Sequence, residues 1–558
     1  MNEFEKRYKN LNTAQKQAVD TIDGPVMVVA GPGTGKTELM SMRVARILKE
    51  TDTLPEHILC LTFTDSGAQA MRDRLLSIIG PAAYKVAIHT FHSFGGEIIS
   101  HYREHFYRGA VFQPADELRQ LEMIANILGE LPHDNPLSST MNGQYTYLHD
   151  VKTVISELKR SGLSSEQFLE VLERTDEDID HIESLLKDTF VQRMSAKLVA
   201  PISSALEKLQ QYNAMNQTVY EIPSLVSVAA TSLEAALAEV ESTGKTPALS
   251  AWKRQWFSGT GESFGLKARE QSKKLHAVSS VYYSYLTRME GAGLYDFDDM
   301  ILQVVQQLEY NDDLRFSLQE KYLYVSVDEF QDTNLAQMRI IHSLTNNPVA
   351  EGKPNILVVG DDDQAIYSFQ GANVSNILNF KHHFPATKII ALTDNYRSTE
   401  PVLQQARDII IQGVDRLETS LEDITKQLTS HSPDKGEVSI VKAKTIEDER
   451  RWLVQDIARQ LKQGAAPQDI AVFTRQHHEL KSLLPYFEAA DIPVSYEYQD
   501  DALIQPPISA LILLARTVVA LASNNHILAD AYLPELLAHP AWEIAPHELW
   551  ELSVEAYD

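Results

Sequence analysis

The chain is nearly free of cysteine, because Cys60 is the only one among 558 residues. A single thiol cannot form an intrachain disulfide, and it excludes a zinc site built from several cysteines. The amino-terminal residues are polar and charged, without the apolar segment of a secretion signal. The longest apolar run, at 508–522, contains Arg516 and is short for a membrane span. These absences favour a protein of the reducing cytoplasm with no membrane partner.

Basic residues are scarce relative to acidic ones, since 50 Lys and Arg stand against 77 Asp and Glu and the net charge is −27. This balance argues against indiscriminate binding to polyanions. It leaves open a single strand held in a local basic or aromatic groove. The hydrophobic fraction of 44% is typical of globular proteins, and the length predicts about three or four domains.

A glycine-rich segment follows an apolar strand pattern near the amino terminus and precedes a helix pattern. Glycines let backbone N–H groups close around phosphate oxygens, and the helix adds its positive amino-terminal end. Lys36 is placed for the β- and γ-phosphates and the Thr37 hydroxyl for Mg²⁺. The segment therefore predicts a phosphate loop that binds a nucleoside triphosphate, with alanine at the first position where the general pattern has glycine. The loop residues are Ala30, Gly31, Pro32, Gly33, Thr34 and Gly35.

Two carboxylates, Asp328 and Glu329, end a second apolar strand pattern. A buried strand directs the residues at its carboxyl end toward a ligand site, so Asp328 fits a Mg²⁺ ligand and Glu329 a general base for water. Gln364 follows a further strand pattern and could donate to a γ-phosphate. Arg397 follows another and could stabilise transition-state charge from across a cleft. Together these residues supply what triphosphate hydrolysis needs.

Strand patterns alternate with helix patterns, which predicts a parallel sheet with crossover helices. Ligands of such sheets sit beyond the carboxyl ends of the strands. Two strand ends carry Phe63 and Phe91 beside hydroxyl groups, which suits base stacking and phosphate contacts on a single strand. For Phe63 and for Phe91, packing in the hydrophobic core is an equally good interpretation. Gln15, upstream of the loop, could read an adenine edge with its amide, although a surface position is the commoner alternative.

Helical periodicity replaces the strand patterns over residues 111–278, which indicates a helical insertion. Its acidic run at 173–183 is expected to form a solvated face. A basic cluster near its end is a candidate phosphate contact, with a plain exposed helix face as the commoner alternative. The cluster consists of Lys267, Arg269, Lys273 and Lys274.

Seven motifs occur in one order along the chain: LNTAQ, AGPGTGKT, LTFTDSGAQAMRDR, TFHSF, VDEFQDTN, VGDDDQAIYSFQGA and DNYRS. In this order they resemble the UvrD/Rep/PcrA group of superfamily 1 DNA helicases. The resemblance implies an α/β fold of RecA-like P-loop NTPase lobes, built on parallel sheet, with a large helical insertion. The implied domains are a first motor lobe at 1–110 and 279–398, the helical insertion at 111–278, part of a second motor lobe at 399–530, and the start of a second helical insertion at 531–558.

The resemblance also implies ATP and Mg²⁺ as cofactors and assigns each matching residue a role. Gln15 would hydrogen-bond the adenine and Tyr396 would stack on it. Lys36, Thr37 and Asp328 would hold the phosphates and the metal. Glu329 would activate water, Gln364 would couple the γ-phosphate to the DNA track, and Arg397 would be one of two arginine fingers.

Single-stranded DNA is the partner that the resemblance implies, together with junctions between duplex and single strand. Movement would run 3′ to 5′, in DNA repair or recombination, with repair partners unspecified. Bases would stack on aromatic rings as the motor lobes close and open. The contacting residues would be Phe63, Thr64, His92, Tyr367 and Phe369.

Some positions depart from the family pattern. Glu38 stands where many members have an arginine near the base, so nucleotide affinity could differ. Phe369 stands where many have tryptophan, which is a conservative change for stacking. Asp65 and Ser66 replace a common Asn-Lys pair and remove one phosphate-binding charge.

After a linker at 430–436, the remaining residues predict strands at 437–444, 469–475 and 492–498 with helices between and after them. Two late motifs of the family, one for DNA contact and one bearing an arginine, are not found. We therefore expect a truncated or degenerate chain that binds ATP and unwinds poorly. Alternatives are a non-translocating ATP- and DNA-binding regulatory relative and the motor part of a helicase–nuclease. A small-molecule kinase would leave the aromatic strand ends unexplained.

Overall fold

The computed structural model describes residues 3–106, 112–141, 144–215, 220, 222–366, 375–413, 416–420, 424–496, 505–523 and 526–557. The chain folds as two compact units, Met1–Gly436 and Glu437–Asp558. None of the helices in the described ranges combines the length and apolar character that crossing a membrane requires.

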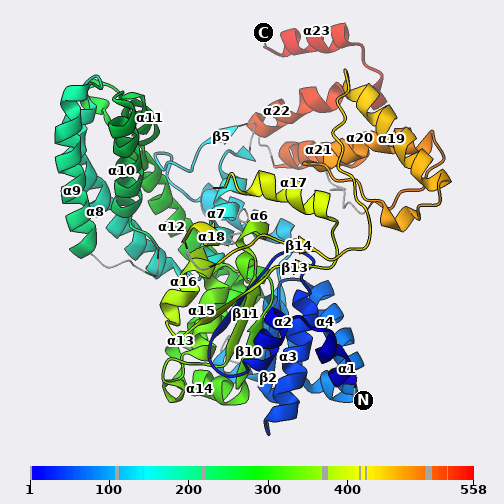
Figure 1. Cartoon of the computed structure of the whole chain (residues 1–558). Coiled ribbons are helices and arrows are strands. Elements are labelled where there is room, and N and C mark those ends of the chain that lie inside the picture. Colours follow the sequence, from blue (N-terminus) through cyan, green and yellow to red (C-terminus); the bar gives the residue numbers. More distant parts are fainter. Residues whose placement is uncertain are drawn as a thin grey trace. The chain divides into compact units, whose positions relative to one another are not determined.

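Six of the described strands form one parallel sheet in the first unit, in the order β12-β1-β11-β10-β2-β3 (Figure 1). The four inner strands are nearly continuous apolar runs that are buried throughout, as expected for strands covered on both faces. The neighbouring positions of β1, β11 and β10 bring the segments that follow them together at one edge. This architecture confirms the predicted α/β fold. The strands are β1 (Val26–Ala30), β2 (Ile58–Thr62), β3 (Ala87–Thr90), β10 (Tyr324–Val327), β11 (Ile356–Gly360) and β12 (Lys388–Leu392).

Helices cover both faces of this sheet, and each face has its own apolar core. Side chains alternate along β1, so Met27 and Val29 enter one core while Val26 and Val28 enter the other. Helices α1 to α4 cover one face, and α5 with α13 to α16 cover the other (Figure 1). The bounds are α1 (Glu3–Asn10), α2 (Thr13–Asp20), α3 (Lys36–Glu50), α4 (Asp65–Ile79), α5 (Phe91–His101), α13 (Phe297–Tyr310), α14 (Asp312–Lys321), α15 (Leu335–Thr345) and α16 (Ser375–His383).

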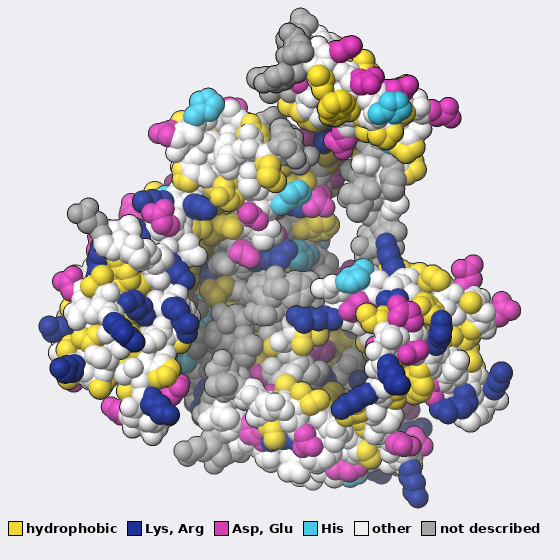
Figure 2. Space-filling model, turned by 90° about the horizontal axis from the view of Figure 1, so that it is seen from above, with side chains coloured by type: hydrophobic (Ala, Val, Ile, Leu, Met, Phe, Trp, Pro, Cys, Tyr) yellow, Lys and Arg dark blue, Asp and Glu magenta, His cyan; other side chains and the backbone are white. Residues whose placement is uncertain are grey.

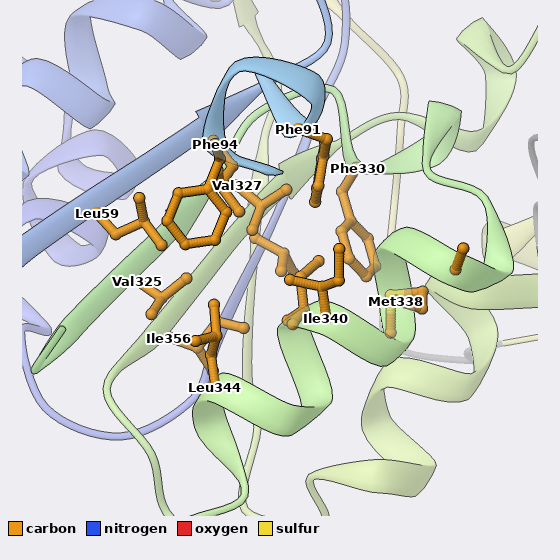
Figure 3. Packing of buried hydrophobic residues seen from close by; sticks show 14 of the residues in the cluster. Leu59, Phe91, Phe94, Val325, Val327, Phe330, Met338, Ile340, Leu344 and Ile356 are labelled. Carbon is orange, nitrogen blue, oxygen red and sulfur yellow. The ribbon is translucent and has the colours of Figure 1, made fainter. Parts of the chain in front are cut away.

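The core beneath α5 and α15 decides the role of Phe91. Its ring points toward Val327 and Phe330 in the close view, together with Phe94 (Figure 3). Phe91 is buried and belongs to this core, so packing is the role that the structure assigns to it. Figure 3 also shows Ile340 and Leu344 of α15 closing the core from the opposite side.

The region between β3 and β10 contains a helical insertion with two apolar cores. Helices α8 and α12 have 26 and 25 residues, contact each other, and contribute to both cores. A capping box between Ser164 and Gln167 starts α8. The helices of the insertion are α6 (Glu117–Gly129), α7 (Leu148–Arg160), α8 (Ser165–Phe190), α9 (Val199–Met215), α10 (Leu225–Thr243), α11 (Pro247–Trp256) and α12 (Lys267–Gly291). Of these, α8 to α11 stand side by side as an arm of upright helices in Figure 1.

Short strand pairs connect parts of the first unit outside the main sheet. One pair joins the segment after β12 to a segment some 35 residues later, and residues 399–436 group with the first unit. The pairs are β4 (Gln113–Pro114) with β9 (Leu294–Tyr295), β5 (Thr140–Met141) with β6 (Gln144–Tyr145), β7 (Phe257–Ser258) with β8 (Gly265–Leu266), and β13 (Asp394–Asn395) with β14 (Thr429–Ser430). Helices α17 (Glu400–Ile410) and α18 (Leu417–Ser420) lie between β13 and β14 in the chain.

The second unit is helical in its described part, and its small core joins α19 to α20. The predicted strands at 437–444, 469–475 and 492–498 are wrong for their described residues, none of which pairs in a ladder. Ile440 and Phe473 are 82% and 90% exposed there. An alternating side-chain pattern favours an extended segment, but a β-strand also needs a neighbouring backbone segment with which to form hydrogen bonds. The helices are α19 (Ile446–Lys462), α20 (His477–Glu488), α21 (Pro506–Ala522), α22 (His526–Leu537) and α23 (Pro546–Tyr557).

Candidate functional site

The glycine-rich loop lies at the carboxyl edge of the sheet, between the end of β1 and the start of α3 at Lys36. Gly33 and Gly35 have φ values of +70° and +86°, in the left-handed region that favours glycine. At Gly33 a Cβ atom would also lie 2.7 Å from the Cβ of Arg397. This is the backbone form that directs successive N–H groups at an anion.

Lys36 and Glu329 form an ion pair across this edge, although 293 residues separate them in the chain. The Nζ of Lys36 lies 2.6 Å from Oε2 of Glu329. Glu329 adopts φ +46°, a left-handed conformation that costs a residue other than glycine of the order of 1–3 kcal/mol. Gln331 donates to the same Oε2 at 2.9 Å. The strained turn and these two donors hold the carboxylate at the loop.

Asp328, the predicted metal ligand, directly follows the last residue of β10. Burial, reinforced by the negative charge of Glu329, raises the pKa of Asp328 to about 6. Its Oδ1 accepts from the Glu329 N–H at 2.9 Å. Together with the Thr37 hydroxyl in the first turn of α3, it offers the hard oxygen donors that Mg²⁺ prefers. Within the described ranges, no group of three or more His, Cys, Asp and Glu side chains could hold a metal ion.

Gln364 is tied to the same edge through an aspartate. Its Nε2 donates to Oδ2 of Asp361 at 2.7 Å, directly after β11. Gln331, which holds Glu329, also accepts from the Asp361 N–H at 3.0 Å. Gln331 thus connects the predicted base to the segment of the predicted γ-phosphate contact.

Lys426 is a functional candidate that the sequence did not suggest. Its ammonium lies 2.5, 2.6 and 2.7 Å from carboxylate oxygens of Asp361, Asp362 and Asp363. Arg416 adds a two-pronged contact to Asp363 at 2.8 Å. The lysine follows the aspartates by more than sixty residues, so no local pattern links them. The cluster joins the Gln364 segment to the chain beyond α17.

Asn395, Tyr396 and Arg397 lie against the phosphate loop. The buried Asn395 donates to the Pro32 carbonyl, and its Oδ1 accepts from the Arg397 N–H at 2.9 Å. The Tyr396 N–H donates to the Gly33 carbonyl at 3.0 Å. Tyr396 is half exposed. The exposed Arg397 side chain has no hydrogen bond or ion pair with the described part of the chain. The backbone contacts therefore position a ring and a cation beside the loop.

Gln15 is buried at the same place. Its Oε1 accepts from the Asn12 N–H at 3.0 Å in a capping box, and its Nε2 donates to the Thr34 carbonyl at 2.9 Å. An amide oxygen accepts two hydrogen bonds and an amide nitrogen donates two, so each atom keeps one further position. Glu38, the departure from the family pattern, is held by Arg7 and Arg74 at 3.3 Å each.

A second group of predicted residues lies at the ends of β2 and β3. Thr64 caps α4, with its hydroxyl accepting from the Gly67 N–H at 3.0 Å, and Phe63 is half-buried. His92 makes an edge contact with Phe297, with the ring centroids 6.2 Å apart. Phe297 is 72% exposed at the first position of α13. Sequence reasoning missed Phe297; the polar residues around it in YDFDDM were the available signal.

Tyr367 and Phe369 lie outside the described residues.

Burial lowers the pKa of His92, so this ring contributes no charge at neutral pH. Within the described ranges, Phe63, Thr64, His92 and Phe297 are therefore the candidate contacts of this edge.

Two members of the insertion's basic cluster, Arg269 and Lys273, form ion pairs within the chain. In the view from above, Lys and Arg side chains are spread over the body on the left, which belongs to the helical insertion (Figure 2). Arg269, however, pairs with Asp180 at 2.7 Å and with Glu183 at 2.8 Å. The acidic run at 173–183 is therefore only partly a solvated face, because two of its members face this arginine. This arrangement weakens the case for Arg269 as a phosphate contact.

Comparisons with known proteins fit this geometry. The family model for the UvrD/REP helicase N-terminal domain matches residues 11–385, and that for the UvrD-like helicase C-terminal domain matches residues 390–521. Among curated proteins, the chain is 26% identical to the ATP-dependent DNA helicase PcrA of Staphylococcus epidermidis over 487 residues. It is 25% identical over 486 residues to the PcrA of Staphylococcus aureus. Each match covers 87% of this chain and 50% of the relative.

The chain thus spans about half the length of the curated relatives it matches. The first family model alone covers more than half of the chain, and it includes the phosphate loop, the carboxylate pair and Gln364. The predicted resemblance is confirmed, and the chain belongs to the UvrD/REP helicase family.

Proposed function

We propose that this chain is the ATP-hydrolysing part of a DNA helicase that moves 3′ to 5′ on single-stranded DNA. The observation that carries the proposal is the contact of Lys36 with Glu329 at 2.6 Å, beside Asp328. A phosphate-loop lysine, a strand-end aspartate and a glutamate base are the parts that phosphoryl transfer requires at one point. Their convergence supports hydrolysis rather than binding alone.

In this proposal ATP enters with its phosphates at the loop and its base at Gln15 and Tyr396. Lys36 moves from Glu329 to the β- and γ-phosphates, which frees the glutamate to accept a proton from the attacking water. Gln364 and Arg397 contribute a hydrogen bond and a positive charge at the γ-phosphoryl oxygens. Mg²⁺, when held by Thr37 and Asp328, supplies charge neutralisation between the phosphates.

Single-stranded DNA is the proposed polymer substrate. The exposed ring of Phe297 beside His92, and the half-buried Phe63, support stacking at the ends of β2 and β3. Tyr367 and Phe369 are proposed to extend this track. With a net charge of −27, affinity is expected to depend on stacking more than on phosphate neutralisation.

The biological setting proposed for this activity is DNA repair or recombination in the cytoplasm, at junctions between duplex and single strand. Residues 1–110 and 279–398 are proposed as the first motor lobe, with 111–278 as an insertion. Residues 399–530 are proposed to belong to a second lobe and 531–558 to a second insertion.

The deciding experiment separates binding from hydrolysis with two variants. Lys36→Ala should lose most ATP affinity, because it removes a charge from the phosphates. Glu329→Gln should bind ATP in the presence of Mg²⁺ and lose DNA-stimulated turnover. Lys49→Ala is the matched control, because Lys49 lies on the same helix as Lys36 and contacts Glu5 and the Phe4 ring on α1.

Isothermal titration gives the affinity, and a steady-state phosphate-release assay gives turnover with and without single-stranded DNA. Equal loss of binding in Lys36→Ala and Glu329→Gln would remove Glu329 from the role of base. A wild-type chain without ATP turnover would contradict the proposed function. Partial duplexes with a 3′ or a 5′ tail test the direction of movement.

A further inference from the structure

A histidine stacks on the ring that is expected to receive the nucleobase. The centroids of Tyr396 and His431 are 5.2 Å apart, and their planes are inclined by 22°. Aromatic pairs at such distances are attractive when offset. Because His431 covers one face of the tyrosine and 50% of Tyr396 remains exposed, the opposite face is left for a ligand.

The backbone brings the two rings together. Strands β13 and β14 pair in parallel, with Asp394 opposite Thr429 and Asn395 opposite Ser430. The next residue on each strand is Tyr396 or His431, so the two side chains are cross-strand neighbours. The His431 N–H donates to the Asn395 carbonyl at 2.7 Å and extends this pairing by one hydrogen bond.

One carboxylate then connects this stack to the helix that carries Gln15. Oδ1 of Asp394 lies 2.8 Å from Nε2 of His431, and Oδ2 accepts from Nδ2 of Asn12 at 2.7 Å. Asn12 caps α2 and also lies 3.3 Å from the Tyr396 hydroxyl. The predicted hydrogen-bonding and stacking partners of the base are thus fastened to each other through Asp394.

We propose that His431 is a positioning residue for the nucleobase, acting through Tyr396. An exposed tyrosine at the end of a two-residue ladder has rotational freedom that a ligand must remove on binding. The stacked imidazole holds the ring before the base arrives, and the contact with Asp394 holds the imidazole. This proposal rests on the proposed function, because it takes the ligand of the phosphate loop to be a nucleoside triphosphate.

The test compares two ligands that share phosphates and differ in the base. Isothermal titration of residues 1–558 with ATP and with inorganic tripolyphosphate, both with Mg²⁺, measures the base contribution as a ratio of affinities. His431→Ala should weaken ATP binding by about two- to tenfold and leave tripolyphosphate binding unchanged. His431→Phe keeps a ring and should bind ATP within about twofold of wild type. His431→Gln keeps a hydrogen-bonding group without a ring and should behave like His431→Ala.

A matched control is available in the helical arm, where His181 stacks on Tyr212 with centroids 3.9 Å apart. His181→Ala removes a histidine from a similar pair far along the chain and should leave both affinities unchanged. An ATP affinity of His431→Ala equal to that of wild type would overturn the proposal. Equal loss of ATP and tripolyphosphate would overturn it as well, because the effect would then not concern the base.

The failure of the proposed function has a different signature. A wild-type chain that binds tripolyphosphate no more tightly than Lys36→Ala does, and that also fails to bind ATP, would refute the triphosphate site itself. A wild-type chain that binds both ligands, with normal affinities in His431→Ala and His431→Gln, would refute only the role of His431.

Discussion

Replacing Lys426 by methionine should destabilise the first unit by about 3–5 kcal/mol, the cost of leaving buried charge without its partner. The side chains of Lys426, Asp361 and Asp362 are 5%, 3% and 1% exposed, so water cannot take the place of the ammonium. Burial alone would lower the pKa of Lys426, but Asp361 and its neighbours raise it above the usual value. The lysine is therefore charged at all pH values of interest, and methionine removes the charge while keeping similar bulk.

The size of the thermal shift follows from the length of the unit. An unfolding entropy of about 2.1 cal/mol/K per residue gives about 0.9 kcal/mol/K for Met1–Gly436. A loss of about 3–5 kcal/mol then lowers Tm by about 3–6 °C. Lys435→Met, on an exposed lysine of the same unit, is the matched control and should leave Tm unchanged. Differential scanning calorimetry measures both.

The pH dependence identifies the cause. Burial would raise the pKa of Asp363, but hydrogen bonds from Arg416 and Lys426 outweigh it and keep this pKa below the usual value. In wild type this stabilisation is present at neutral pH and is lost as pH falls through the lowered pKa. In Lys426→Met one of the two donors that lower the pKa of Asp363 is absent, so protonation of Asp363 in acid should relieve part of the penalty. The difference in Tm between wild type and Lys426→Met should shrink as the pH is lowered from 8 to 5. A difference that grows in acid would refute the reasoning.

Two other predictions concern the DNA edge and the base of the insertion. Phe297→Ala should weaken binding of a single-stranded oligonucleotide by roughly five- to a hundredfold in fluorescence anisotropy, because a base loses its stacking partner. Tyr310→Ala, on a ring 76% exposed at the other end of α13, should have no effect, and equal losses would argue against stacking at Phe297. Burial raises the pKa of Asp299 to about 6, so the native state takes up this proton as pH falls through 6, and stability should rise across that window. Asp299→Asn cannot titrate, and its Tm profile from pH 7 to pH 5 should lack this rise; parallel profiles would contradict it.

The central sheet and the phosphate loop could be predicted because their signals are local. The apolar run before Ala30 and the glycines after it specify a strand and a turn whatever lies elsewhere in the chain. The carboxylates Asp328 and Glu329 were equally visible, since a buried strand directs its last residues outward. Their adjacency to Lys36 needed only the rule that parallel strands share a carboxyl edge.

The features that escaped prediction depend on contacts between distant segments. Lys426 reads as an ordinary polar residue until the fold places three aspartates around it. Arg269 resembles a phosphate contact until the acidic run of α8 packs beside it. In the second unit, periodicity indicated strands near Ile440 and Phe473, but the described residues provide no ladder partner there. The side-chain pattern depends on one segment of the chain, whereas strand pairing depends on two segments, so the pattern alone does not predict the pairing.

The ion pair between Lys36 and Glu329 gives the proposed site an order of events. While the Lys36 ammonium lies 2.6 Å from Oε2 of Glu329, it occupies a carboxylate oxygen that the proposed base needs for the attacking water. In the proposed mechanism, phosphates with several negative charges would compete for the same ammonium, and binding them would release Glu329 from this ion pair. Gln331, which donates to Glu329 and accepts from the Asp361 N–H, links this carboxylate to the Gln364 segment. Hydrolytic competence would then follow occupancy of the phosphate loop, because one lysine serves the two anions in turn.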